Sequence, residues 1–273
     1  GIDIEGSVTA QFDDVIVEDY PFGIIYTGSL FSRDVNTPTL TNIRVRNSSQ
    51  SSRNLSTGVQ LRDLGRIHCS DFIIEDCQIG LEITNSSLVR DASTPTLTNI
   101  RVRNSSQTSR YENAGIFLGN GVGGTLTGAV VEEAIIGIFV ADGNSTRVEP
   151  AQIFNCETGI KAASSLHPKQ IKRHLIVLEP AFQFAHQDWQ FRAIEVSMPG
   201  PWLIENNTLS GYPKYVKAED AGILFNNNIA WNTSPSMLPF QLQNSLLTAT
   251  YNDMFVSPPY PGVGNIALFP EFV

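Results

Sequence analysis

The side chains best suited to acid–base or sugar chemistry gather in one stretch of the chain, residues 165–200. Three of the four histidines fall there, together with a tryptophan and several charged residues. Histidine is a common general acid or base near neutral pH, and a tryptophan ring packs well against a sugar. The alternative, favoured on sequence alone, is a bulky excursion packed against the side of the fold. The candidates for catalysis are His174, His186, Asp188 and Arg192, and the candidate for ligand binding is Trp189.

Two phenylalanines form a second candidate ligand-binding site. Phe117 and Phe139 occupy equivalent positions in two segments, Gly115-Ile-Phe-Leu and Gly137-Ile-Phe-Val, which follow one another at a spacing of 22 residues. If these segments are strands on neighbouring turns of a repeat, the two rings lie side by side and point outward. Exposed stacked aromatic rings suit a sugar or a partner surface. The alternative is that a long turn of the chain covers them.

Composition excludes several classes of partner. The formal net charge is -9, and the 18 lysines and arginines are scattered, so no basic patch for nucleic acid is predicted. No apolar run approaches the roughly 18 residues of a membrane span. The three cysteines, Cys69, Cys77 and Cys156, lie in apolar patterns without zinc spacing and are predicted to be buried thiols. No metal site and no cofactor are predicted; calcium is the alternative where carboxylates crowd.

The elements that must position these residues are defined by an internal repeat. Thr37–Gln50 and Thr94–Gln107 both read TPTLTNIRVRNSSQ, 57 positions apart. Within this repeat, a glycine followed by alternating residues recurs about every 22 residues, with extra turn residues in some repeats. Seven glycines begin such segments: Gly1, Gly23, Gly58, Gly80, Gly115, Gly137 and Gly159. A second short alternating segment precedes each later glycine, and no window shows helical periodicity.

Two short strands per turn predict an all-β fold, a right-handed parallel β-helix of about ten rungs of roughly 22 residues with inserted turns. The chain is predicted to be a single domain over residues 1–273. Residues 1–164 are expected to form regular rungs, 165–200 an irregular excursion, and 201–273 the C-terminal rungs and cap. Gly1 has the phase of Gly23 one rung earlier, so we expect missing upstream rungs or another chain to cover the N-terminal end.

Alignment of the rungs places charges of alternating sign in one outward column: Glu18, Arg46, Glu75, Arg103 and Glu132. Side chains in such a column are nearest neighbours across parallel strands, so the column is predicted to be a charge ladder that fixes register. The next column is a turn column of acids and amides: Asp19, Asn47, Asp76, Asn104, Glu133 and Asn155. These residue types tolerate the left-handed turn conformation, and we interpret the column as structural.

Strands that end in such turns, for example Phe72–Gly80 (FIIEDCQIG) and Gln152–Gly159 (QIFNCETG), resemble the parallel β-helix repeats of the pectate-lyase-like superfamily, bacterial secreted type. The resemblance is strong over residues 1–165, weaker over 165–200, and returns at Trp202. It implies an extracellular or cell-surface protein with a polysaccharide or cell-surface glycan as partner. The Gly-His-Gly and Arg-x-Lys motifs of the pectin hydrolases in this superfamily do not occur in the sequence.

The sequence therefore predicts a secreted or cell-surface β-helix that binds glycans or serves as a structural or adhesive scaffold. The duplicated rungs favour this function, because duplication lengthens a rod without building a unique site. The alternative is a polysaccharide lyase or glycoside hydrolase that acts on an acidic polysaccharide.

Overall fold

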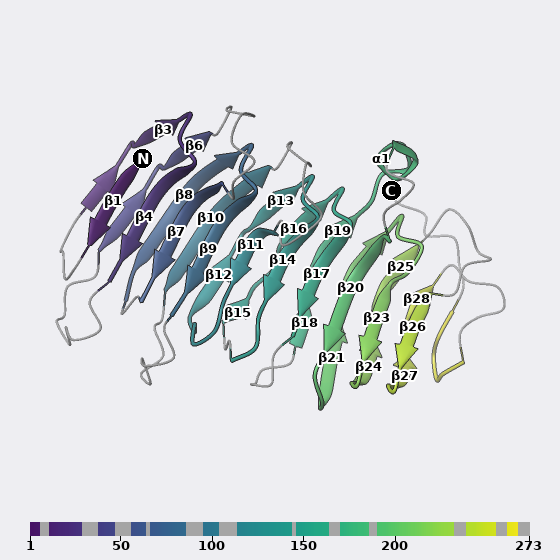
Figure 1. The fold of residues 1–273 in the computed structure, drawn as a ribbon. Coiled ribbons are helices and arrows are strands. Elements are labelled where there is room, and N and C mark those ends of the chain that lie inside the picture. The colour runs from purple at the N-terminus through teal and green to yellow at the C-terminus, as the bar shows by residue number, and fades with distance from the viewer. Residues whose placement is uncertain are drawn as a thin grey trace.

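The chain folds as a right-handed parallel β-helix, in agreement with the sequence prediction (Figure 1). The strands stack from the N-terminal end, purple in Figure 1, to the yellow strands near residue 250. The structure, a computed structural model, describes residues 1–5, 11–28, 38–46, 56–63, 66–85, 95–103, 114–143, 146–163, 170–185, 190–231, 239–254 and 261–266.

Three parallel sheets run along the solenoid. Sheet A has ten strands: β1 (Ile2–Glu5), β4 (Phe22–Thr27), β7 (Thr57–Arg62), β9 (Ile79–Thr84), β11 (Ala114–Leu118), β14 (Ile136–Val140), β17 (Thr158–Ala162), β20 (Arg192–Ser197), β23 (Val216–Glu219) and β26 (Phe240–Gln243). Each of these strands belongs to one rung, which agrees with the predicted number of rungs.

Sheet B holds the strands that precede sheet A in each rung: β2 (Gln11–Asp13), β3 (Ile16–Glu18), β5 (Thr39–Thr41), β6 (Arg44–Arg46), β8 (His68–Glu75), β10 (Thr96–Arg103), β12 (Thr125–Thr127), β13 (Val130–Glu132), β15 (Arg147–Val148), β16 (Gln152–Phe154), β19 (Leu175–Val177), β22 (Thr208–Ser210), β25 (Ile229–Trp231) and β28 (Asp253–Met254). Sheet C belongs to the later rungs: β18 (Gln170–Lys172), β21 (Pro201–Glu205), β24 (Gly222–Asn226) and β27 (Leu246–Thr250).

The recurring glycine has a steric cause. Successive glycines of sheet A lie directly above one another, and a Cβ atom on Gly23 would lie 2.4 Å from the carbonyl oxygen of Gly58. The same imagined atom would also lie 2.4 Å from the Val45 side chain in the core. Gly58 and Gly137 are confined in the same way by the next glycine and by an inward-facing isoleucine. A side chain at this position would therefore overlap both the neighbouring rung and the core.

The turns between strands use residues that tolerate positive φ. Asp14, Asn42 and Asp71 have φ values of 55°, 52° and 61° at the bend inside sheet B. In the predicted turn column, Asp76 and Glu133 have φ values of 57°. Asn47 and Asn104 of that column lie outside the described residues. Short polar side chains at these bends explain the Asn and Asp content of the repeat.

The core consists of stacked inward columns, as predicted. One of them changes chemistry along the helix. It begins with apolar residues such as Ile43 and Phe72 and becomes an asparagine ladder of Asn207, Asn228, Asn252 and Asn265. In this ladder each side-chain oxygen accepts the backbone N–H of the preceding asparagine, at 2.9 Å for Asn207 and Asn228. The three cysteines are free and buried, in agreement with the prediction, and burial raises the pKa of the Cys156 thiol to about 12.

The predicted charge ladder has the expected register, but its ion pairs reach one residue further along the chain. In the strand register, Arg46 lies opposite Glu18 on one neighbouring strand and opposite Glu75 on the other. The ion pairs themselves join Arg46 to Asp76, at 3.6 Å, and Arg103 to Glu133, at 3.2 Å. An arginine side chain is long enough to reach past its cross-strand neighbour to the acid in the next turn. The arginines of the charge ladder therefore form their ion pairs with acids of the turn column.

The N-terminal end shows strand rather than a cap in the part that the structure describes. β1 is the end strand of sheet A and pairs with β4 alone, while residues 6–10 lie outside the described residues. A covering chain or upstream rungs at this end stay a prediction. Within the stretch 165–200, β19 and β20 continue sheets B and A, β18 begins sheet C, and the described departure from the rungs is the short helix α1 (Pro180–Ala185).

Candidate functional site

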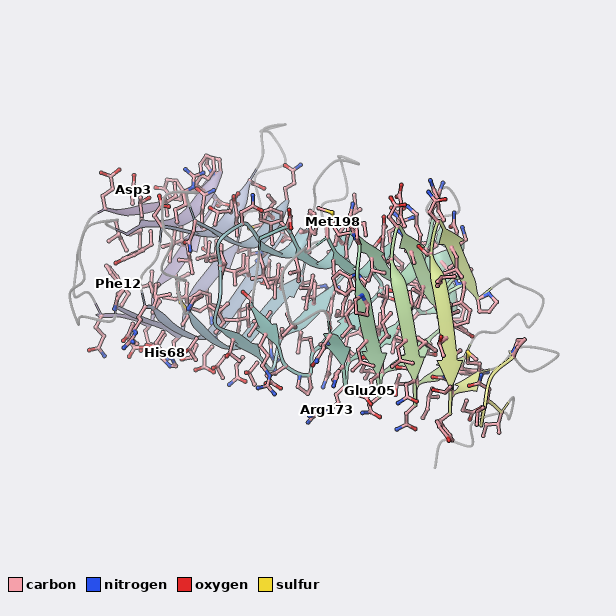
Figure 2. All side chains as sticks on the ribbon, turned by 90° about the horizontal axis from the view of Figure 1, so that it is seen from below. Asp3, Phe12, His68, Arg173, Met198 and Glu205 are labelled. Carbon is pink, nitrogen blue, oxygen red and sulfur yellow. The ribbon has the colours of Figure 1, made fainter. Side chains whose placement is uncertain are left out.

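The outward face of sheet A brings the predicted aromatic pair together with charged residues. We call this surface the sheet A face. It is a single column of side chains, one from each strand, in which neighbours are paired across the sheet: Asp3, Ile25, Gln60, Glu82, Phe117, Phe139, Lys161, Glu195, Lys217 and Gln241. Figure 2 shows Asp3 of this column on one long side of the solenoid, and His68, Arg173 and Glu205 on the opposite side.

The two phenylalanines lie on adjacent strands, as the sequence predicted, and both rings are half-buried rather than fully exposed. The ring centroids of Phe117 and Phe139 lie 5.2 Å apart with an interplanar angle of 70°, an edge-to-face arrangement. The Lys161 ammonium lies 5.3 Å from the centroid of the Phe139 ring, within the range of a cation–π contact. Gly119 leaves room for this platform, because a Cβ atom there would lie 3.2 Å from Phe117 Cε1. The rings are thus in contact with neighbours on the sheet on both sides.

Polar groups flank the aromatic pair on both sides. Gln60 Nε2 donates to Glu82 Oε2 at 2.6 Å on the N-terminal side. On the C-terminal side, Glu195 forms two ion pairs. Its Oε1 lies 3.1 Å from Lys217 Nζ, and its Oε2 lies 2.5 Å from Arg192 Nε. Arg192, a candidate for catalysis, therefore reaches the sheet A face, where its Nε–H donates to Thr158 Oγ1 at 3.1 Å and its contact with Glu195 Oε2 is an ion pair without a hydrogen bond.

Sequence reasoning did not single out Lys217 as part of a site. The available signal was its position, since Lys217 follows Glu195 by one basic rung of 22 residues. The role of the lysine as the partner of a carboxylate depends on the pairing of β20 with β23, which the sequence did not show across the weaker part of the repeat.

His174, another candidate for catalysis, is built into the interior. It is 3 % exposed and stands in the same column as the asparagine ladder. Its Nδ1 accepts the backbone N–H of Ala151 at 3.2 Å, and its own backbone N–H donates to Asn207 Oδ1 at 3.0 Å. Burial lowers the pKa of His174 to about 4, so the ring is neutral near pH 7. These contacts give the residue a structural role as the first polar step of the ladder.

A recess opens beside His174 where the sheets change. β15 pairs with β12, and β18 pairs with β21, but β15 and β18 do not pair with each other. A pocket of about 360 Å³ lies between them, with core side chains and the buried Trp202 in its lining. Ion pairs join Arg147 to Glu149, at 2.6 Å, and Lys172 to Glu205, at 2.9 Å. The hydrogen bond from Lys172 lowers the pKa of Glu205. The charges of these two pairs neutralise one another, and the described lining of the recess is otherwise a mixture of apolar side chains with polar ones such as Arg173.

The remaining sequence candidates, His186, Asp188 and Trp189, lie outside the described residues, so their predicted roles are untested. Among the residues that the structure describes, no three of the His, Cys, Asp or Glu side chains gather in a way that could hold a metal ion. The calcium alternative is not tested by this finding. No described helix is long and apolar enough to cross a membrane.

Comparison with known proteins adds no family assignment. No family model matches the chain, and neither the curated proteins nor the solved structures give a match. The conclusions on function therefore rest on the geometry of the chain itself.

Proposed function

We propose that this protein is a secreted or cell-surface β-helix of the pectate-lyase-like type that binds glycans on the sheet A face. The observation that supports the proposal is the edge-to-face pair of Phe117 and Phe139 on an outward column of the solenoid, 5.2 Å apart. A pyranose ring has one face of C–H groups that packs on such rings. Successive rungs advance by roughly 4.8 Å, which is comparable with the length of one sugar in a chain. A glycan lying along the solenoid axis would meet one residue of the column per sugar.

The polar flanks suit the hydroxyl groups of such a chain. Glu82 on one side of the rings presents an acceptor and Lys161 on the other a donor at the same level as the aromatic platform, while the buried Gln60 holds the Glu82 carboxylate. Small-molecule sites combine apolar surface with a few placed polar groups in this way. The surface is rigid because every strand is held by its neighbours, so little conformational entropy is lost on binding.

Binding is better supported than catalysis on this face. Glu195 forms ion pairs with Arg192 and Lys217, which hold it as a charged carboxylate, and its Oε2 is buried away from solvent. A general acid or base needs a proton that it can exchange with the substrate. A lyase or hydrolase remains the alternative function, and an assay for unsaturated or reducing products of acidic polysaccharides tests it directly.

The test of the proposal is a glycan-binding measurement on aromatic variants. Phe117→Ala and Phe139→Ala should each weaken binding of the best ligand from a panel of neutral and acidic oligosaccharides by about tenfold or more, as loss of an aromatic platform does. Phe154→Ala, which removes a half-buried outward ring from sheet B, is the matched control and should leave affinity unchanged. Failure of the folded protein to bind any glycan in the panel, or unchanged binding in a folded double variant, would overturn the proposal.

A further inference from the structure

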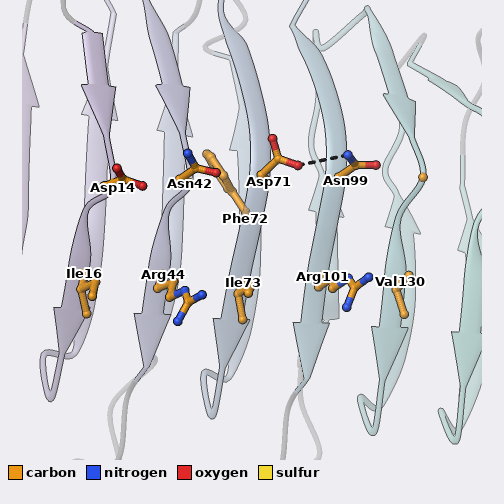
Figure 3. Close-up of a pocket in the computed structure, with 11 residues that line it drawn as sticks. Asp14, Ile16, Asn42, Arg44, Asp71, Phe72, Ile73, Asn99, Arg101 and Val130 are labelled. Carbon is orange, nitrogen blue, oxygen red and sulfur yellow. Dashed lines mark hydrogen bonds between the residues drawn. The ribbon is translucent and has the colours of Figure 1, made fainter.

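A second concave surface lies on the other side of the solenoid, at the bend inside sheet B. Here a pocket of about 630 Å³ crosses five rungs (Figure 3). Two columns line it: the bend residues Asp14, Asn42, Asp71, Asn99 and Gly128, and the outward strand residues Ile16, Arg44, Ile73, Arg101 and Val130. A pocket of about 380 Å³ adjoins it and shares Arg44 and Ile73 with it. We call the surface formed by the two columns of the larger pocket the arginine groove; the adjoining pocket, which Glu18, Arg46 and Glu75 also line, is not part of it.

The chemistry of the arginine groove alternates from rung to rung. Arg44 and Ile73 are neighbours across the sheet, as are Ile73 and Arg101, so one apolar rung separates the two arginines. The bend column alternates in step, because Asn42 and Asn99 lie on the arginine rungs and Asp71 lies on the rung between them. Two rungs advance along the solenoid axis by about 10 Å, twice the spacing of neighbouring strands. The surface thus repeats with a period of two rungs, which the duplicated segment TPTLTNIRVRNSSQ imposes on it.

Among the described residues, the two arginines of the groove differ from those of the charge ladder in that they form no ion pair. Arg46 and Arg103, two residues further along the same strands, are paired with Asp76 and Glu133. Arg44 and Arg101 are exposed, and within the part of the chain that the structure describes neither makes an ion pair. Two exposed cations therefore stand on a concave surface of mixed polar and apolar residues, and no described acid forms an ion pair with either of them, although the protein carries a net charge of -9.

The rung between the arginines would meet a different chemical group. Ile73 offers apolar surface there, and the Asp71 carboxylate accepts the side-chain N–H of Asn99 at 3.1 Å and has further acceptor capacity (Figure 3). An anionic group at this level would face Asp71 without a cation. A neutral sugar would instead place C–H groups on Ile73 and donate a hydroxyl hydrogen bond to Asp71.

We propose that the arginine groove binds an acidic polysaccharide in which an anionic sugar alternates with a neutral one. The chain lies along the solenoid axis, with carboxylates or sulfates at Arg44 and Arg101 and the neutral sugar at Asp71 and Ile73. Planar guanidinium groups bind carboxylates and sulfates through paired charge-assisted hydrogen bonds. Nucleic acid fits less well, because the aromatic residue in the lining, Phe72, is fully buried and offers no ring for base stacking, and the acids of the groove repel a phosphate on every unit.

This proposal goes beyond glycan binding on the sheet A face and is independent of it. Titration calorimetry with a hyaluronan octasaccharide, in which uronate alternates with a neutral amino sugar, should detect binding that weakens as salt is raised. An oligogalacturonate of the same length, with a carboxylate on every sugar, should bind more weakly, and a neutral malto-oligosaccharide should not bind the groove.

The strands provide matched controls for the cations. Arg44→Ala and Arg101→Ala should each reduce hyaluronan affinity by about tenfold, the usual effect of losing one hydrogen-bonded charge. Arg46→Ala and Arg103→Ala remove the same charge two residues away and should change affinity by less than about twofold, because these side chains are committed to Asp76 and Glu133. Circular dichroism establishes that each variant is folded.

Three results would overturn the inference: no binding of hyaluronan, equal losses in the Arg44 and Arg46 variants, or tighter binding of oligogalacturonate than of hyaluronan. Phe117→Ala separates the two sites. If that variant abolishes hyaluronan binding while Arg44→Ala does not, the ligand occupies the sheet A face, so the arginine groove is refuted and the proposed function stands.

Discussion

Acid should destabilise this β-helix through one buried histidine. His174 accepts a hydrogen bond from the Ala151 backbone at Nδ1, and burial lowers its pKa from 6.5 to about 4. In the unfolded chain the imidazole is exposed and takes up a proton at the ordinary pKa. Between these two values the unfolded state therefore binds a proton that the folded state does not, and stability must fall as the pH falls.

The size of the effect follows from the gap between the two pKa values of His174, 6.5 and about 4. At about 1.4 kcal/mol per pH unit, full passage through the window costs about 3 kcal/mol. The loss begins as the pH drops below 6.5 and is complete near 4, and above 6.5 the histidine adds no pH dependence. Since domains are stable by roughly 5–15 kcal/mol, such a change is readily measured.

The variant that isolates this effect is His174→Asn, because it extends the asparagine ladder by one step. The new amide oxygen can accept the Ala151 N–H as Asn207 accepts that of residue 174, and the side chain does not titrate. Urea unfolding at a series of pH values should show the wild type losing about 3 kcal/mol more than the variant between pH 6.5 and 4. Parallel loss of stability in the two proteins would refute the reasoning.

Further predictions concern the ladders and the glycine column. Asn228→Ala removes buried hydrogen bonds in the middle of the asparagine ladder and should cost about 3 kcal/mol in urea unfolding, whereas Asn227→Gly, at an exposed bend with φ of 53°, should cost little. Arg46→Glu should lower the melting temperature more than Arg46→Ala, and the difference should shrink in 1 M salt, since the side chain is 59 % exposed; equal effects at low salt would contradict a charge ladder. Gly159→Ala should cost about 2 kcal/mol or more, because its Cβ would lie 2.5 Å from the Ala193 oxygen; wild-type stability would show that the rungs separate easily.

The architecture could be predicted from the sequence because a solenoid encodes its contacts locally. Each rung meets the next at a fixed offset, so a recurrence such as Gly115 and Gly137 specifies at once the strands, their register and the stacking of Phe117 on Phe139. The charge column from Glu18 to Glu132 was predictable for the same reason, since a slip of one residue would bury its charges and expose Ile74.

Other features could be assigned only from the tertiary structure. They depend on contacts between rungs in the part of the chain where the sequence repeat becomes weak. The sequence placed His174 among the catalytic candidates. In a stretch without a clear repeat, the sequence does not show whether a histidine side chain faces solvent or the core. Only the stacking of that rung on Asn207 shows that it begins a buried ladder.

The arginine groove illustrates the same division. The duplicated Ile-Arg-Val-Arg segment is visible in the sequence, and both of its arginines point outward by alternation. Which of them is paired depends on whether the side chain reaches the acid in the next turn. Arg46 reaches Asp76, whereas Arg44 lines a concave surface of mixed polar and apolar residues and forms no ion pair among the described residues. Periodicity therefore determined where each side chain stands, whereas three-dimensional curvature and side-chain length decided which charges remain available to a ligand.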